Sequence, residues 1–129
     1  MLELKDIAQK GDWKQEKHVP AIEVLKEKTE GIFNIKVTVG KDIEHPNTTE
    51  HHIAWIELYF LADGEKFVKD LGRQEFNAHG SSIQGPNTSG IVTDPSGIFR
   101  LRTMKNGELI ASSFCNIHGL WQGLAELKI

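Results

Sequence analysis

The only cysteine of the chain, Cys115, is followed three residues later by His118, in the stretch CNIHGLW of residues 115–121. A cysteine binds metals as the thiolate and a histidine as the neutral imidazole, and together they suit a borderline-soft transition ion. Both residues also have a purely structural interpretation, because a lone cysteine is often buried and a nearby histidine can simply be hydrogen-bonded. The pair therefore indicates one corner of a metal site, and further ligands must come from elsewhere.

Further histidines gather in two short segments far upstream of this corner. The first segment is EKHVP, residues 16–20, and the second is HPNTTEHH, residues 45–52. Each segment precedes a stretch with a β-strand pattern, and loops at one end of an all-β scaffold can converge on a single site. His51 and His52 are adjacent, so at the start of a strand they point to opposite faces and cannot both easily reach one metal.

The set of candidate ligands is larger than a structural zinc site requires, since such a site takes four ligands in a closed tetrahedron. Four imidazoles and one thiolate suit an iron with one open coordination position instead. The candidates are His18, His45, one of the adjacent pair His51 and His52, Cys115 and His118.

The pattern of apolar residues predicts an antiparallel β-sandwich of about seven short strands. Residues 32–39 alternate apolar and polar side chains, and the apolar run 53–60 predicts a central strand buried on both faces. Further strands are expected at 67–76 with a bulge at Gly72, at 91–93, at 98–103 and 108–114 as a hairpin around Asn106-Gly107, and at 124–129. Residues 2–10 predict one or two helical turns at most. The pattern alone does not exclude a barrel.

Length and charge limit the classes of function. The 129 residues predict one domain over 1–129, and a single cysteine fits a reducing compartment. The net charge of −3 with scattered basic residues argues against nucleic-acid binding. No apolar stretch predicts a signal peptide or membrane span, so we expect a cytoplasmic protein without membrane contact. An anionic protein repels anionic substrates at long range, and Lys17 is the candidate cation that would counter this near the site.

The motifs EKHVP, HPNTTEHHI and CNIHGLW, in this order and with GRQEFNAHG and QGPNTS between them, resemble superoxide reductase of the one-iron, neelaredoxin form in the desulfoferrodoxin family. The resemblance runs from about Asp12 to Trp121. It implies an immunoglobulin-like sandwich and one mononuclear non-haem iron (Fe²⁺/Fe³⁺) per chain. The implied ligands are His18, His45, His51 and His118 around the iron's equator and Cys115 on its axis, with the sixth position open to solvent. His52 and His79 match the motifs but are not ligands in the family.

The resemblance also implies roles for two neighbours of His18. Glu16 would occupy the sixth position of the oxidised iron and leave on reduction, and Lys17 would attract superoxide and help to deliver a proton. A strictly extended segment would place Lys17 opposite Glu16 and His18, so either the loop bends or the Lys17 side chain swings round. We also expect the backbone N–H groups of Ile117 and His118 to point at the Cys115 sulfur.

The implied activity is the one-electron reduction of superoxide to hydrogen peroxide. No N-terminal desulforedoxin-like domain is expected, because no cysteine lies there. The electron would therefore come from a separate small protein such as rubredoxin, and the family form is commonly a homotetramer.

Three other interpretations stay open at this point. A β-sandwich copper protein for electron transfer also builds a Cys-x-x-His corner, but it normally adds a methionine ligand, and residues 119–129 contain none. A structural metal domain predicts that the loss of Glu16 and Lys17 changes stability alone. Superoxide dismutation by the same iron site predicts turnover without any reductant.

Overall fold

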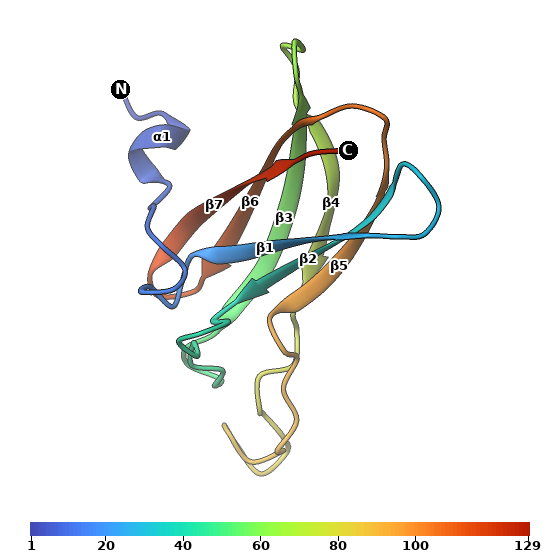
Figure 1. The fold of residues 1–129 in the computed structure, drawn as a ribbon. Helices are drawn as coiled ribbons and strands as arrows, with labels where there is room; N and C mark the ends of the chain where they lie inside the picture. The colour runs from blue at the N-terminus through green and yellow to red at the C-terminus, as the bar shows by residue number, and fades with distance from the viewer.

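The computed structural model describes the whole chain, Met1–Ile129, as two antiparallel sheets packed face to face (Figure 1). The elements are α1 (Leu4–Ile7), β1 (Pro20–Lys26), β2 (Ile32–Val39), β3 (Ile53–Ala62), β4 (Lys69–Glu75), β5 (Ser96–Arg102), β6 (Gly107–Cys115) and β7 (Gly119–Leu127). The sheets have the strand orders β1-β2-β5 and β4-β3-β6-β7. The predicted all-β, immunoglobulin-like sandwich of seven strands is confirmed. No helix has the length and apolar character to cross a membrane.

The core lies between the two sheets and is built from alternate residues of β2, β3 and β6. Ile35, Ile56 and Leu109 are completely buried there, one from each of these strands. The predicted strand at 32–39 has the expected register, but the expectation that β3 is buried on both faces is wrong. Its burial alternates, and Trp55 and Tyr59 are only half-buried, because they lie on the outer face of the four-stranded sheet.

The bulge predicted at Gly72 is confirmed. Leu58 of β3 pairs with Gly72 and Tyr59 pairs with Asp70, which leaves Leu71 as the extra residue of β4. Gly72 has φ of +136°, a backbone conformation that residues with a Cβ atom rarely adopt. The bulge therefore sits where the sequence can accommodate it.

The hairpin predicted at Asn106-Gly107 is wrong. β5 pairs with β2, whereas β6 pairs with β3 and β7, so the connection between them crosses from one sheet to the other. Neither Asn106 nor Gly107 has the positive φ of a two-residue hairpin turn. Glycine is needed at 107 for another reason, since a Cβ atom there would collide with the backbone of Leu61. Residues 91–93 form no strand but a single bridge between Val92 and His79.

One end of the sandwich collects the loops that carry the candidate ligands. β1, β3 and β7 begin at this end and β2 and β6 finish there, at the lower left of the ribbon in Figure 1. Gly123 of β7 has no side chain because the carbonyl group of Pro20 passes directly over it. This close approach brings the segment that precedes β1 alongside β7.

Candidate metal centre

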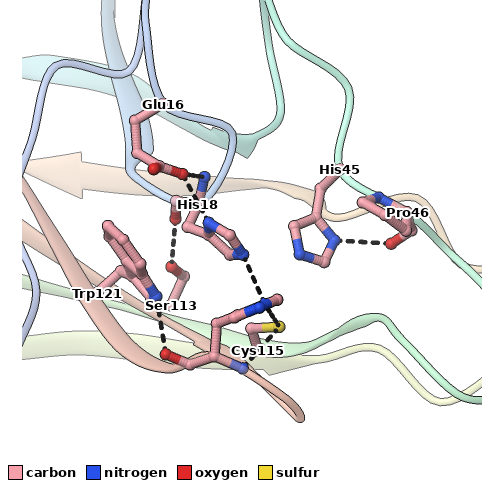
Figure 2. A network of polar contacts seen from close by, with 8 residues as sticks. Glu16, His18, His45, Pro46, Ser113, Cys115 and Trp121 are labelled. Atoms are coloured by element: carbon pink, nitrogen blue, oxygen red, sulfur yellow. Dashed lines mark hydrogen bonds and ion pairs between the residues drawn. The ribbon is translucent and has the colours of Figure 1, made fainter.

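The five predicted ligands meet at this end of the sandwich. The ligand atoms of His18, His45, His51 and Cys115 all lie within 4.8 Å of one another. The fifth residue, His118, presents Nδ1 at 3.2 Å from Nε2 of His18 and at 3.7 Å from Sγ of Cys115. The sequence separates these residues by up to 100 positions, and the strand ends bring them together. Figure 2 shows His18, His45 and Cys115 of this cluster.

Hydrogen bonds orient two of the imidazole rings with Nε2 toward the cluster. Nδ1–H of His18 donates to Oε1 of Glu16 at 2.6 Å, and Nδ1–H of His45 donates to the carbonyl oxygen of Pro46 at 2.7 Å (Figure 2). Each bond places the proton on Nδ1, so Nε2 of both neutral rings carries a lone pair that can bind a metal. Ring orientation by a carboxylate or a carbonyl group is the usual arrangement around metal-binding histidines.

Nε2 of His45 and Nε2 of His51 are the only buried side-chain nitrogen or oxygen atoms of the chain that lack a hydrogen-bond partner. A buried polar atom without a partner costs free energy, and native proteins rarely leave one unpaired. Both atoms belong to the cluster, where a cation would satisfy them. The donor set therefore fits a bound metal ion.

Cys115 is the last residue of β6 and its side chain is completely buried. The backbone N–H of His118 donates to its sulfur at 3.3 Å, as predicted, whereas Ile117 makes no such bond. A thiolate with a backbone donor at its sulfur is a suitable soft ligand, and the donor moderates its electron density. His118 itself is exposed, so one side of the cluster is open to solvent.

The cluster disfavours protonated imidazoles. Burial lowers the pKa of His45 from its usual 6.5 to about 4, although the hydrogen bond to Pro46 raises it. Burial also lowers the pKa of His18 and that of His51, and the positive charge of Lys17 contributes in the same direction for all three residues. At neutral pH these rings are therefore neutral, which is the form that binds metals.

Glu16 and Lys17 lie beside the cluster, in a loop that bends at residues 17–19. Oε1 of Glu16 accepts hydrogen bonds from Nδ1–H and from the backbone N–H of His18, at 2.6 and 2.8 Å. Burial raises the pKa of Glu16, but these bonds outweigh it and lower the pKa below its usual value. In this conformation the carboxylate orients His18 from the side of Nδ1 and is not directed at the ligand atoms.

The remaining histidines, His52 and His79, pack against each other outside the cluster. Their rings stack with centroids 3.5 Å apart and 4° between the planes. Nδ1–H of His52 donates to the carbonyl oxygen of Thr48 at 2.8 Å, and the ring nitrogens of His79 contact Asn47 and the carbonyl oxygen of Phe76. Their position joins the loop of His45 and His51 to the loop that follows β4.

Two contacts of His18 were not anticipated from the sequence. The hydroxyl group of Ser113, a buried residue of β6, donates to the carbonyl oxygen of His18 at 2.9 Å. The ring of Trp121 stacks on the His18 ring with centroids 4.6 Å apart. Trp121 belongs to the CNIHGLW stretch, but its spacing from Cys115 does not reveal which ring it covers.

The fold and the site define a β-sandwich protein with one candidate metal centre, built from imidazoles and one cysteine at the rim of the sheets. The desulfoferrodoxin family profile matches residues 10–124, and the chain belongs to this family.

Named relatives match over nearly the whole chain. It is 54% identical to the superoxide reductase of Pyrococcus furiosus, covering 97% of this chain and 99% of the relative. It is 48% identical to the neelaredoxin of Megalodesulfovibrio gigas, covering 94% of each. A solved structure of the reduced superoxide reductase (neelaredoxin) of Archaeoglobus fulgidus superposes with a TM-score of 0.91 at 58% identity, covering 95% of this chain and 99% of that one.

Proposed function

We propose that this protein is a superoxide reductase with one mononuclear non-haem iron, held by His18, His45, His51, Cys115 and His118. The observation that carries the proposal is the convergence of imidazoles, those of His18 and His45 buried, on a buried cysteine, with two Nε2 atoms that lack any other partner. The family and the relatives named superoxide reductase support the same activity.

The donor set favours iron over the copper alternative. Both methionines lie away from the cluster: Met1 is at the exposed N-terminus, and Met104 contacts Gly31 in the turn between β1 and β2. A blue-copper centre lacks its usual axial ligand here and leaves two of the four imidazoles unused. When bound, iron supplies one electron by changing from Fe²⁺ to Fe³⁺, so that superoxide, one electron and two protons give hydrogen peroxide.

The residues on the solvent-exposed side of the cluster carry out the protein's part of this reaction. His118 is exposed, so a small anion can approach the centre from solvent on this side. The Lys17 ammonium group supplies a local positive charge in a chain with a net charge of −3. Glu16 orients the His18 ring. We propose that its carboxylate would also bind the oxidised iron, for which it would have to release Nδ1 of His18.

We further propose that a separate small electron-transfer protein such as rubredoxin re-reduces the centre, and that the chain works in the cytoplasm as a homotetramer. The family resemblance supports the donor and the assembly. A buried free thiol that must stay reduced to bind metal supports a reducing compartment.

The function is tested with iron-loaded, fully reduced protein and a known amount of superoxide under anaerobic conditions. We expect one hydrogen peroxide for each superoxide. Without a reductant, the consumption of superoxide should stop after one superoxide per protein chain. Continued consumption without reductant would establish dismutation instead. No reaction of the iron-loaded protein would exclude both activities.

Replacing Lys17 with alanine is expected to lower the second-order rate constant with superoxide about 10-fold at low salt, because the local cation no longer steers the anion. Lys14→Ala is the matched control, since Lys14 is an exposed lysine of the same loop. Stopped-flow measurement at two ionic strengths checks the result. Equal rates for the two variants would contradict a steering role for Lys17.

A further inference from the structure

A single indole links two predicted ligands that lie 100 residues apart in the sequence. The Trp121 ring stacks on the His18 ring with centroids 4.6 Å apart and 13° between the planes. Its Nε1–H donates to the carbonyl oxygen of His118 at 3.1 Å (Figure 2). One side chain of β7 therefore contacts both the loop before β1 and the turn between β6 and β7.

We propose that Trp121 is a positioning residue of the metal centre, which fixes the plane of the His18 imidazole and holds the backbone of the His118 turn. The proposal rests on the proposed function only in taking these two histidines as iron ligands. It does not depend on the reaction with superoxide.

The stacked indole adds to hydrogen bonds that restrain the plane of the His18 ring only in part. The Ser113 hydroxyl group holds the His18 carbonyl oxygen, and Glu16 holds Nδ1. Rotation about the bond that joins a histidine ring to Cβ has a broad energy profile, so the contacts of Nδ1 with Glu16 and of Nε2 with His118 leave some freedom in the ring plane. A flat surface stacked across the imidazole restricts that rotation and directs Nε2 at the cluster.

The indole can act in this way because its own position is well determined. Trp121 pairs with Ser113 of β6 in the sheet. On its other side Gln9 donates its N–H to the carbonyl oxygen of Leu120 and accepts from the N–H of Gln122, both at 2.9 Å. The backbone of Trp121 is thus held between two segments, and the restraint passes from the sheet to the His18 ring.

Trp121 also lines an apolar cavity of about 490 Å³ on the outer face of the four-stranded sheet, which provides a matched control. Trp55 of β3 lines the same cavity but stacks on Phe114 at 5.6 Å, and it makes no aromatic contact with a histidine. A change at Trp55 therefore removes a large aromatic ring from the same sheet without touching the ligands.

The test compares three variants: Trp121→Leu, which loses the stack and the hydrogen bond; Trp121→Phe, which keeps a smaller aromatic ring but loses the hydrogen bond; and Trp55→Leu. NMR of the metal-free protein reports the His18 ring protons, which the stacked indole shifts upfield. We expect this shift to disappear in Trp121→Leu, to persist in part in Trp121→Phe, and to be unchanged in Trp55→Leu.

Anaerobic competition with a chelator for Fe²⁺ measures the consequence for the centre. We expect about 10-fold weaker binding in Trp121→Leu, which is typical for the loss of a residue that orients a ligand. The wavelength of the charge-transfer band from the Cys115 thiolate to Fe³⁺ should also change. Wild-type His18 resonances and wild-type affinity in Trp121→Leu, or an equal loss in Trp55→Leu, would overturn the proposal.

Circular dichroism shows whether Trp121→Leu is folded. If it is not, Trp121→Phe decides: the lost bond to His118 should weaken Fe²⁺ binding about 3-fold, the size expected for one hydrogen bond. Wild-type affinity in this variant would then overturn the proposal. A chain that binds iron as expected but fails to reduce superoxide would contradict the proposed function and leave the role of Trp121 intact.

Discussion

Replacing Cys115 with serine is expected to abolish the charge-transfer band from thiolate to Fe³⁺ and to lower the rate with superoxide at least about 100-fold. A serine hydroxyl group remains protonated at neutral pH and does not replace the thiolate as a donor. Changes to residues that merely orient metal ligands already cost 10–100-fold, so the loss of a ligand should cost at least as much. The side chain is completely buried, so no outside group can take its place.

The measurement combines iron content, the visible spectrum of the oxidised protein and the rate of superoxide reduction. Ala111→Ser is the matched control, because it introduces the same hydroxyl group at another completely buried position of β6, away from the ligand cluster. This variant should be less stable but should keep the band and the rate. Retention of the band in Cys115→Ser would show that the sulfur is not an iron ligand.

The stability of the metal-free protein is expected to fall as the pH is lowered from about 6.5 towards 4. The pKa of His45 is about 4 in the folded chain and about 6.5 in the unfolded chain. Between these values the unfolded state binds the proton and the folded state does not, so acidification favours unfolding. A shift of this size corresponds to about 3 kcal/mol for His45 alone, and the lowered pKa values of His18 and His51 add in the same direction.

Urea unfolding of the metal-free protein at several pH values between 7 and 4.5 measures how the free energy of unfolding changes with pH. His45→Gln should reduce this pH dependence, because the substituted side chain does not titrate. The iron-loaded protein should lose its metal over the same range, since protons compete with the metal for the imidazoles. A free energy of unfolding that stays constant or rises between pH 7 and 5 would contradict the prediction.

The chemistry of the candidate site was predictable because it depends on residue types that few other roles require. Cys115, His118 and the histidine segments 16–20 and 45–52 supplied the candidate ligands, and the folded chain brings them together at strand ends. The alternation in 32–39 likewise determined a strand, since one face had to be buried. A strand pattern of this kind is local, and its period of two residues is enough to recognise it.

Features that depend on contacts between distant segments were decided only in the folded chain. Asn106-Gly107 has the local chemistry of a hairpin, but β5 finds its partner in β2, so the chain crosses between the sheets. The sequence also could not show that Glu16 bonds to Nδ1 of His18.

The sequence by itself therefore determined which donors are available and the all-β framework that carries them. The tertiary structure decided which nitrogen of each ring faces the cluster and which aromatic ring lies on His18. The physical reason is that ring orientation follows from hydrogen bonds and packing among five separate loops and strand ends, whose relative positions are settled only when the two sheets pack together.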